Sequence, residues 1–280
     1  MNSKRLLLAV GVVLIALISV LFINGSESDA TSSPLASSSR DTRGLPSKDG
    51  GREEPDVPEG CKIKQWNSVE DFDVNLAQFE TVFWDPRDTI SLRKLIRESD
   101  LVADAKVLEI GCGSGLLGLC CLKSGASQVI VTDVNQAAVA NTNYNAQWLG
   151  LQAGIETRLV PLDDSGAFSV IKPDEKFDLI ISNPPWVNQD PKSIDEFALY
   201  DKNFKLMRSL FDGMKERLNP GGRVWLAYGC VDAIRTMAIL ADDHGFDFKV
   251  LDDRNLDDLP EEFLPGMLVE VKLKGIQDRK

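Results

Sequence analysis

A short proline-rich corner carries the side chains best suited to chemistry. Asn183, Pro184, Pro185 and Trp186 follow an apolar run, residues 177–182, that is typical of a buried strand. Two consecutive prolines lack the backbone N–H groups that a sheet needs, so the strand must end there in a rigid turn. An amide and a fixed backbone carbonyl accept hydrogen bonds, so the corner favours chemistry that depends on positioning. By itself it also fits a strand end with a tryptophan in the core.

A second candidate is the glycine-rich stretch LEIGCGSGLLG, which joins a predicted strand at 106–110 to a predicted helix. Gly113, Gly115 and Gly118 match the pattern G-x-G-x-x-G, and Asp133 lies at the end of the next predicted strand. Glycines allow a backbone to approach a ligand closely, and an acid at that position can bind ribose hydroxyls. The motif alone predicts a dinucleotide site, and a tight turn without a ligand is the alternative.

Two features favour S-adenosylmethionine over a nicotinamide cofactor. Glu109 stands just before Gly111, where a carboxylate suits the ammonium of a methionine moiety but would repel a pyrophosphate. A nicotinamide dehydrogenase also needs a proton donor near its hydride site, and the corner at Asn183 offers only an amide and carbonyls. The single histidine, His244, is predicted at the end of a helix.

Taken together, EIGCGSG, TDVN and NPPW resemble a known family. They are similar to class I S-adenosylmethionine-dependent methyltransferases of the small-domain, N-methylating group, which includes release-factor glutamine and rRNA N-methyltransferases. The resemblance covers roughly residues 80–275. It implies that the Asn183 side-chain oxygen and the Pro184 carbonyl accept hydrogen bonds from the target nitrogen, which Trp186 helps to hold. Pro184 and Pro185 would lock the backbone, and no strong base is needed when positioning dominates.

The resemblance and position along the chain also imply the remaining contacts. Asp163 is expected beside the adenine, with Asp164 as the alternative. The segment TVFWDPRDT is similar to the one before the first helix of the glutamine-methylating relatives, but a packed N-terminal cap explains it equally well. The predicted cofactor residues are Glu109, Gly111, Cys112, Gly113, Gly115, Asp133 and Asp163, and the predicted substrate-pocket residues are Phe83, Trp84, Arg87 and Thr89.

The pattern of elements predicts how these residues are brought together. Apolar strands alternate with helices from residue 90 onward, which indicates a parallel sheet with helices on both faces. A long helix is expected over roughly 198–218. The last two strands have no clear helix between them and can pair as an antiparallel edge. The expected fold is therefore α/β and Rossmann-like, with a seven-stranded, mostly parallel sheet.

The first 60 residues differ in composition from the rest. Residues 6–23 are apolar and uncharged, and a helix of ~20 residues spans a bilayer. We therefore predict a single-pass membrane anchor over 1–23, in preference to a cleaved signal, a disordered linker over 24–60, and the methyltransferase domain over 61–280. The sequence leaves open on which side of the membrane the catalytic domain would lie. Lys4 and Arg5 would place the domain outside, whereas the cofactor and reduced cysteines favour the inside.

The net charge and the cysteine content bear on which partners and metal ions the protein is expected to bind. The formal net charge of −12 argues against binding mainly through nucleic-acid phosphates. The five cysteines fit no zinc spacing and there is one histidine, so no metal site is expected. A protein or peptide nitrogen, such as that of a glutamine side chain, is the favoured acceptor. The alternatives are an exocyclic amine of RNA or DNA, and a non-catalytic protein that only binds the cofactor.

Overall fold

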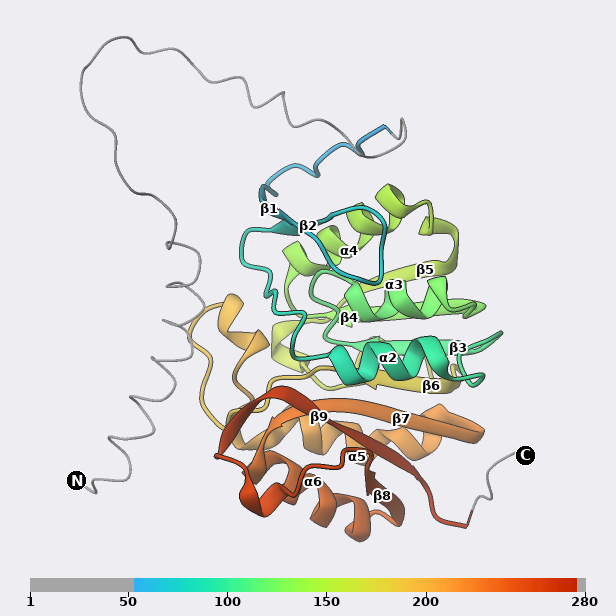
Figure 1. The fold of residues 1–280 in the computed structure, drawn as a ribbon, viewed down its shortest axis with the longest axis vertical. Helices are drawn as coiled ribbons and strands as arrows, with labels where there is room; N and C mark the ends of the chain where they lie inside the picture. The colour runs from blue at the N-terminus through green and yellow to red at the C-terminus, as the bar shows by residue number, and fades with distance from the viewer. Residues whose placement is uncertain (1–52, 276–280) are drawn as a thin grey trace, which may run out of the picture. The chain divides into compact units, whose positions relative to one another are not determined.

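The computed structural model describes residues 53–275, in which strands and helices alternate as the sequence predicts (Figure 1). The elements, in chain order, are β1 (Ile63–Asn67), β2 (Leu76–Phe79), α2 (Ile90–Glu98), β3 (Lys106–Ile110), α3 (Leu116–Lys123), β4 (Gln128–Asp133), α4 (Gln136–Leu149), β5 (Ile155–Leu159), β6 (Phe177–Ser182), α5 (Lys205–Arg217), β7 (Leu218–Cys230), α6 (Val231–Asp243), β8 (Phe246–Val250) and β9 (Glu262–Leu273). Short 3-10 turns are η1 (Gln152–Gly154), η2 (Leu162–Asp164), η3 (Asp195–Ala198), η4 (Lys202–Phe204) and η5 (Leu256–Asp258).

The main sheet has seven strands in the order β5-β4-β3-β6-β7-β9-β8. Strands β3 to β7 pair in parallel, and β9 runs antiparallel to both of its neighbours. This confirms the predicted Rossmann-like, mostly parallel sheet. The two last strands pair antiparallel as expected, but β9 lies inside the sheet and β8 forms the edge. Met267, Leu268 and Val269 of β9 are all buried, so this strand needs cover on both faces, whereas β8 is half exposed.

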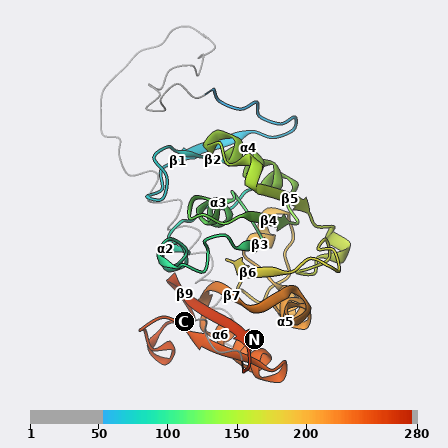
Figure 2. The same cartoon turned by 90° about the vertical axis from the view of Figure 1, so that its right-hand side faces the viewer.

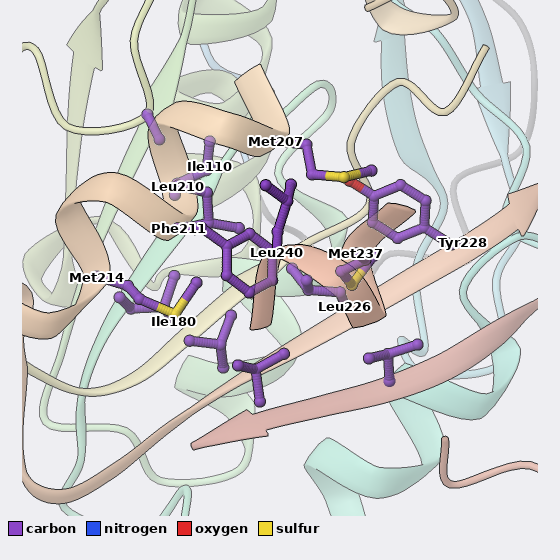
Figure 3. Packing of buried hydrophobic residues seen from close by; sticks show 14 of the residues in the cluster. Ile110, Ile180, Met207, Leu210, Phe211, Met214, Leu226, Tyr228, Met237 and Leu240 are labelled. Carbon is purple, nitrogen blue, oxygen red and sulfur yellow. The ribbon is translucent and has the colours of Figure 1, made fainter. Parts of the chain in front are cut away.

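Alternate side chains of each strand enter two separate cores. On β3, Val107 packs with residues of α2, α3 and α4, whereas Leu108 packs with residues of α5 and α6. This follows from the two-residue period of a strand. Figure 2 shows α2 and α5 on opposite sides of the strands. Figure 3 shows Phe211 of α5 among side chains of the second core; burying one such side chain contributes about 1.5–3 kcal/mol.

The predicted helix at 198–218 is shorter in the structure. It begins as α5 at Lys205, because Asn203 and Phe204 adopt left-handed backbone conformations with φ of 56° and 52°. The Asp201 carboxylate accepts hydrogen bonds from the backbone N–H groups of Leu206 and Met207, and so caps the shortened helix. Residues 187–204 are consequently a long loop with 3-10 turns, which forms a wall of the site described below.

A second, unpredicted sheet precedes the main fold. Strands β1 and β2 form an antiparallel hairpin, and buried asparagines of α4 hold β2. Asn141 Oδ1 accepts from Phe79 N, and Asn145 Oδ1 accepts from Ala77 N, both at 2.9 Å. Their amide groups donate to the Ala77 carbonyl. Two side chains thus replace a neighbouring strand, and they fix the start of the segment that runs on to α2.

The predicted membrane location is wrong as far as the described structure reaches. Within residues 53–275 no helix is both long and apolar enough to cross a bilayer. The longest helix there, α4, has 14 residues, whereas a span needs ~20. Residues 6–23, on which the prediction rested, lie outside the described residues, and so does most of the predicted linker. The proposed domain boundary at residue 61 stays a prediction; Glu54, just before it, accepts a hydrogen bond from Tyr144 Oη at 2.9 Å.

Candidate cofactor and substrate site

A cavity of about 850 Å3 lies at the carboxyl ends of β3, β4 and β6. This edge is where ligands bind in open α/β sheets. Residues 81–89 form one wall and residues 190–212 another. The predicted site residues that line the cavity are Phe83, Trp84, Thr89, Glu109, Gly111, Cys112, Gly113, Asp133, Asn183 and Pro185. Most of the predicted site residues therefore surround a single cavity.

The glycine loop folds tightly over the end of β4. Gly111, Gly113 and Gly115 have φ values of 75°, 51° and 84°, which favour glycine over other residues. The Thr132 carbonyl accepts from the N–H groups of Gly111, at 2.8 Å, and of Cys112, at 3.0 Å. Gly115 does not line the cavity, and its role is packing. A Cβ there would lie 2.7 Å from Thr142 of α4.

Asp133 ties this loop to the start of α4. Its Oδ2 accepts from Gly113 N at 2.9 Å, and its Oδ1 accepts from Asn135 N at 2.8 Å. Each carboxylate oxygen has a second lone pair, so both can still accept from hydroxyl groups in the cavity. Burial raises the pKa of Asp133 above its usual value, and the backbone N–H groups oppose this rise.

Glu109 is a buried acid at the floor of the cavity. Its side chain is 1% exposed, and its Oε2 accepts from Gly118 N at 2.9 Å. Burial, together with the nearby Asp133, raises the pKa of Glu109 well above its usual value. A ligand cation in the cavity would compensate this carboxylate, because an opposite charge favours the ionised form. Burial and the nearby Asp133 and Glu109 also raise the pKa of the Cys112 thiol well above its usual value, which disfavours the thiolate.

The Asn183 corner carries an unsatisfied acceptor. Asn183 Oδ1 is buried and has no hydrogen-bond partner within residues 53–275, and the same holds for Thr89 Oγ1. Both residues line the cavity. Buried polar atoms normally have a hydrogen-bond partner, so these two unpartnered oxygens indicate a site that binds a ligand. Ser182 Oγ donates to the Ile110 carbonyl at 2.5 Å and joins the end of β6 to the end of β3. Pro184 is buried and does not line the cavity, so the predicted role of its carbonyl stays a prediction.

Besides Gly115 and Pro184, three predicted residues do not line the cavity. Trp186 packs instead near the end of β7, where a Cβ on Gly229 would lie 3.1 Å from its ring. Arg87 pairs with Asp85, and its side chain is 59% exposed. Asp163 is exposed on η2, although its neighbour Leu162 lines the cavity. The stacking role of Trp186 and the adenine contact of Asp163 stay predictions.

Sequence reasoning did not single out several residues at the site. Phe197 and Tyr200 line the cavity from the long loop after β6. Asp88, in the segment DPRDT, is 3% exposed and lies near the Asn183 side chain, and burial raises its pKa to about 7. The aromatic residues could have been found as apolar positions in a polar loop. Asp88 could not, because Asn183 lies far along the chain.

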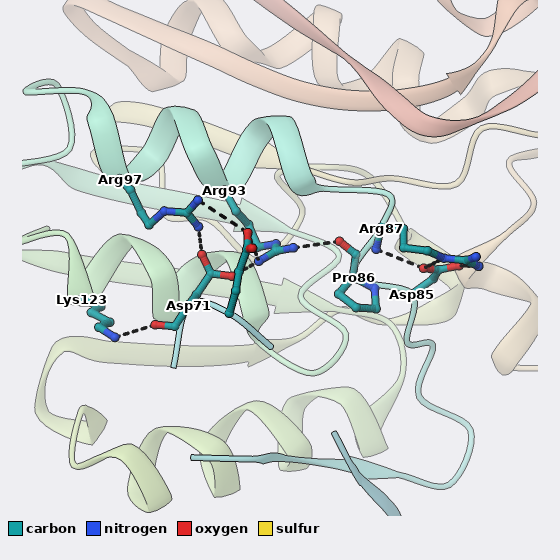
Figure 4. A network of polar contacts seen from close by, with 8 residues as sticks. Asp71, Asp85, Pro86, Arg87, Arg93, Arg97 and Lys123 are labelled. Carbon is teal, nitrogen blue, oxygen red and sulfur yellow. Dashed lines mark hydrogen bonds and ion pairs between the residues drawn. The ribbon is translucent and has the colours of Figure 1, made fainter. Parts of the chain in front are cut away.

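A buried ionic network holds the 81–89 wall in place (Figure 4). Arg93 of α2 donates to the Pro86 carbonyl at 3.0 Å and also pairs with the buried Asp71. Arg97 pairs with the same carboxylate, and Lys123 of α3 donates to the Asp71 carbonyl. Removing one partner of a buried pair costs about 3–5 kcal/mol, so this network is structural. Through Arg93 it holds the wall at the Pro86 carbonyl.

Comparison with known proteins gives the family. The family model described as "Methyltransferase small domain" matches residues 85–235, more than half of the 280-residue chain. The chain belongs to the methyltransferase small domain family. This confirms the predicted resemblance and, with it, the expectation of S-adenosylmethionine as the cofactor.

This methyltransferase-family chain is also similar to curated proteins. It is 31% identical over 171 residues to a release factor glutamine methyltransferase of Cereibacter sphaeroides, covering 54% of this chain and 59% of the relative. It is 30% identical over 153 residues to one of Bordetella pertussis, covering 49% and 53%. The chain thus spans a little over half the length of each relative. A solved SAM-dependent methyltransferase from Agrobacterium tumefaciens superposes with a TM-score of 0.52 at 17% identity, covering 75% of this chain and 69% of that one, and this shows the fold alone.

The donor groups at the site also bear on metal binding. No group of three or more His, Cys, Asp or Glu side chains within residues 53–275 is arranged to hold a metal ion. Two acidic groups of the cavity, Glu109 and Asp133, accept hydrogen bonds from backbone N–H groups.

Proposed function

We propose that this methyltransferase transfers a methyl group from S-adenosylmethionine to the side-chain amide nitrogen of a protein glutamine. The observation that carries the proposal is the buried, unpartnered Oδ1 of Asn183 at the cavity. The names of the two curated relatives support glutamine as the acceptor. The net charge of −12 further favours a protein acceptor over one bound through phosphates.

The residues of the cavity fit the cofactor. Bound S-adenosylmethionine supplies a methyl group on a positively charged sulfur. Asp133 would hold the ribose through its free lone pairs, and Glu109 would face the ammonium group. The glycine loop, from Gly111 to Gly115, would allow close approach of its backbone. These assignments rest on the position of each group at the cavity, and a carboxylate below a cation agrees with the buried Glu109.

The chemistry asked of the protein is mainly positioning. A carboxamide nitrogen is a weak nucleophile because its lone pair is delocalised into the carbonyl group. Asn183 Oδ1 and the Pro184 carbonyl would accept its two hydrogens and hold the nitrogen in line with the transferred methyl group. Thr89 Oγ1, the other unpartnered atom at the cavity, would donate to the amide carbonyl. Well-oriented reactants can gain several kcal/mol from such alignment.

The test is methyl transfer by the purified full chain. Isotope-labelled S-adenosylmethionine is incubated with purified release factors and, separately, with total RNA, and the modified residue is mapped by mass spectrometry. We expect label on a glutamine nitrogen, and at least a hundredfold loss of rate for Asn183→Ala with S-adenosylhomocysteine affinity within about threefold. Label in RNA alone, or equal rates in the variant, would overturn the proposal. The matched control is Asn143→Ala, a partly buried asparagine that hydrogen-bonds Thr157 on the outer part of the sheet.

A further inference from the structure

Residues 187–204 form a loop that starts directly after the Asn183–Trp186 corner and folds back toward it. Val187 N donates to the Leu199 carbonyl at 3.2 Å, and Asp201 N donates to the Val187 carbonyl at 2.9 Å. Much of the segment between these bonds lines the cavity. The loop is therefore a wall of the cavity whose two ends meet at the residue that follows the corner.

The far end of this wall has an unusual backbone. Asn203 and Phe204 are consecutive residues in the left-handed region, with φ of 56° and 52°. Asparagine tolerates this region, whereas a bulky side chain such as phenylalanine rarely adopts it. Such conformations cost free energy, persist only where the surrounding structure holds them, and are frequent at ligand sites. Other contacts must therefore maintain this turn of the chain.

The sequence permits a longer helix at this point. Residues 198–204 contain neither glycine nor proline, either of which would interrupt a helix. Apolar and aromatic residues continue with helical spacing through the junction, at positions 200, 204, 207 and 211. In the structure α5 nevertheless begins at Lys205. The observed arrangement is called the kinked form below, and the alternative, in which residues 198–204 join α5, the extended-helix form.

The two forms compete for the same hydrogen-bonding groups. In the kinked form Asn203 N donates to Asn188 Oδ1 at 2.7 Å, while the Leu199 carbonyl accepts from Val187 N. In an α-helix each N–H donates to the carbonyl four residues earlier, so Asn203 N would donate to the Leu199 carbonyl instead. Val187 would then lose that acceptor, and the wall would separate from the residue next to the corner.

Three features favour the kinked form. The Asp201 carboxylate, 6% exposed, accepts from two N–H groups in the first turn of α5 and so caps the helix where it now begins. Phe204 is 8% exposed and packs in the core formed with α5 and α6. The third is the bond from Asn203 N to Asn188. It alone of the three joins the far end of the wall to the end beside the corner.

We propose that Asn188 is a positioning residue, which holds the wall in the kinked form and thereby confines the acceptor glutamine beside Asn183. The proposal deepens the function proposed above and rests on it for the chemistry. The kinked form is the one that binds the acceptor, so a variant that populates it less raises the apparent KM for the acceptor. The rate at saturating acceptor is unchanged, because the bound acceptor restores the kinked form.

The first experiment needs no acceptor. Hydrogen exchange of the Asn203 backbone N–H is followed by 15N NMR in the full chain. We expect exchange about fivefold or more faster in Asn188→Ala than in the wild type, as expected for one lost hydrogen bond. Asn188→Asp keeps an acceptor oxygen and should restore the protection. Equal exchange in Asn188→Ala and the wild type would overturn the proposal, whatever the acceptor is.

The second experiment changes only the backbone preference at the kink. Asn203→Gly and Asn203→Ala remove the same side chain from the cavity, so any direct contact with the acceptor is lost equally in both. Glycine adopts a positive φ readily and is a poor helix residue, whereas alanine has the opposite preferences. In methyl transfer to a release factor, Asn203→Ala should therefore show a KM about fivefold or more above that of Asn203→Gly. Equal KM values, or a higher one in Asn203→Gly, would contradict the proposal.

The third experiment separates acceptor positioning from other roles of Asn188. Asn188→Ala should raise the KM for the release factor by about threefold to tenfold, and Asn188→Asp should bring it back. The single-turnover rate at saturating acceptor and the affinity for S-adenosylhomocysteine should both stay near the wild-type values. A matching loss of S-adenosylhomocysteine affinity would show that the wall serves the cofactor, and the proposal would fail.

The matched control is Asn255→Ala. Asn255 is also an exposed asparagine that accepts from a backbone N–H, that of Asp257 at 3.2 Å, but it lies on the η5 turn and does not line the cavity. Its KM and its Asn203 exchange rate should match the wild type. If the wild-type chain methylates no glutamine, the proposed function fails, and the exchange experiment still decides whether Asn188 holds the wall.

Discussion

Glu109 Oε2 and the backbone N–H of Gly118 lie 2.9 Å apart beneath the glycine loop. A Cβ on Gly118 would lie 2.6 Å from the same oxygen. Gly118, the third glycine of the motif, is thus required because it packs against Glu109. It does not line the cavity.

The Gly118→Ala variant tests this packing. We expect a loss of about 1–3 kcal/mol in the free energy of unfolding, because the added methyl group must displace the Glu109 carboxylate. Alanine is otherwise the better helix residue by about 1 kcal/mol, so a gain in stability would contradict the packing. The measurement is urea denaturation followed by tryptophan fluorescence. Titration with S-adenosylhomocysteine should show weaker binding in the same variant.

Replacing Glu109 by glutamine tests the charge of this acid. The folded-state pKa is raised, so the ionised form costs stability that grows as pH rises above the unfolded value. Glu109→Gln should therefore be at least as stable as the wild type at pH 8. It should bind S-adenosylhomocysteine about tenfold or more weakly. Binding of 5′-methylthioadenosine, which lacks the ammonium group, should be unchanged, and an equal loss for both ligands would refute the assigned contact.

Asp133→Ala tests the ribose contact. We expect at least a tenfold loss of S-adenosylhomocysteine affinity by calorimetry, which corresponds to about 1.4 kcal/mol. Asp133→Asn keeps one acceptor for the Gly113 or Asn135 N–H and should lose less. Affinity equal to that of the wild type in Asp133→Ala would mean that the acid only braces the loop.

Two possible roles of Trp186, packing in the core and stacking on the acceptor, predict different effects of its replacement. Its ring packs near Gly229 in the structure, so Trp186→Ala should lower the free energy of unfolding by about 2–4 kcal/mol. A residue that only stacks on the acceptor would leave stability unchanged and raise the apparent KM. Comparing Trp186→Phe with Trp186→Ala in both unfolding and steady-state kinetics decides between packing and stacking.

The strands, the glycine loop and the Asn183 corner could be predicted because each depends on local sequence. Apolar runs of five or six residues marked β3, β4 and β6, and prolines marked the end of β6. The hairpin could not, because β1 is polar and half exposed and β2 is held by side chains of α4. Asp88 and Asn183 lie on distant segments of the sequence, so only the folded chain shows that they are near each other. Residues 198–204, by which α5 is shorter than the predicted helix, contain no glycine or proline that would mark the break.

The hold of α4 on β2 has a consequence for change within this fold. Asn141 and Asn145 bond the hairpin through its backbone, and Asn145 Nδ2 also donates to the Ser114 carbonyl of the glycine loop at 2.9 Å. The same side chain thus holds the hairpin that leads into the 81–89 wall and the glycine loop that lines the cavity. A substitution at Asn145 would therefore disturb both walls of the cavity together.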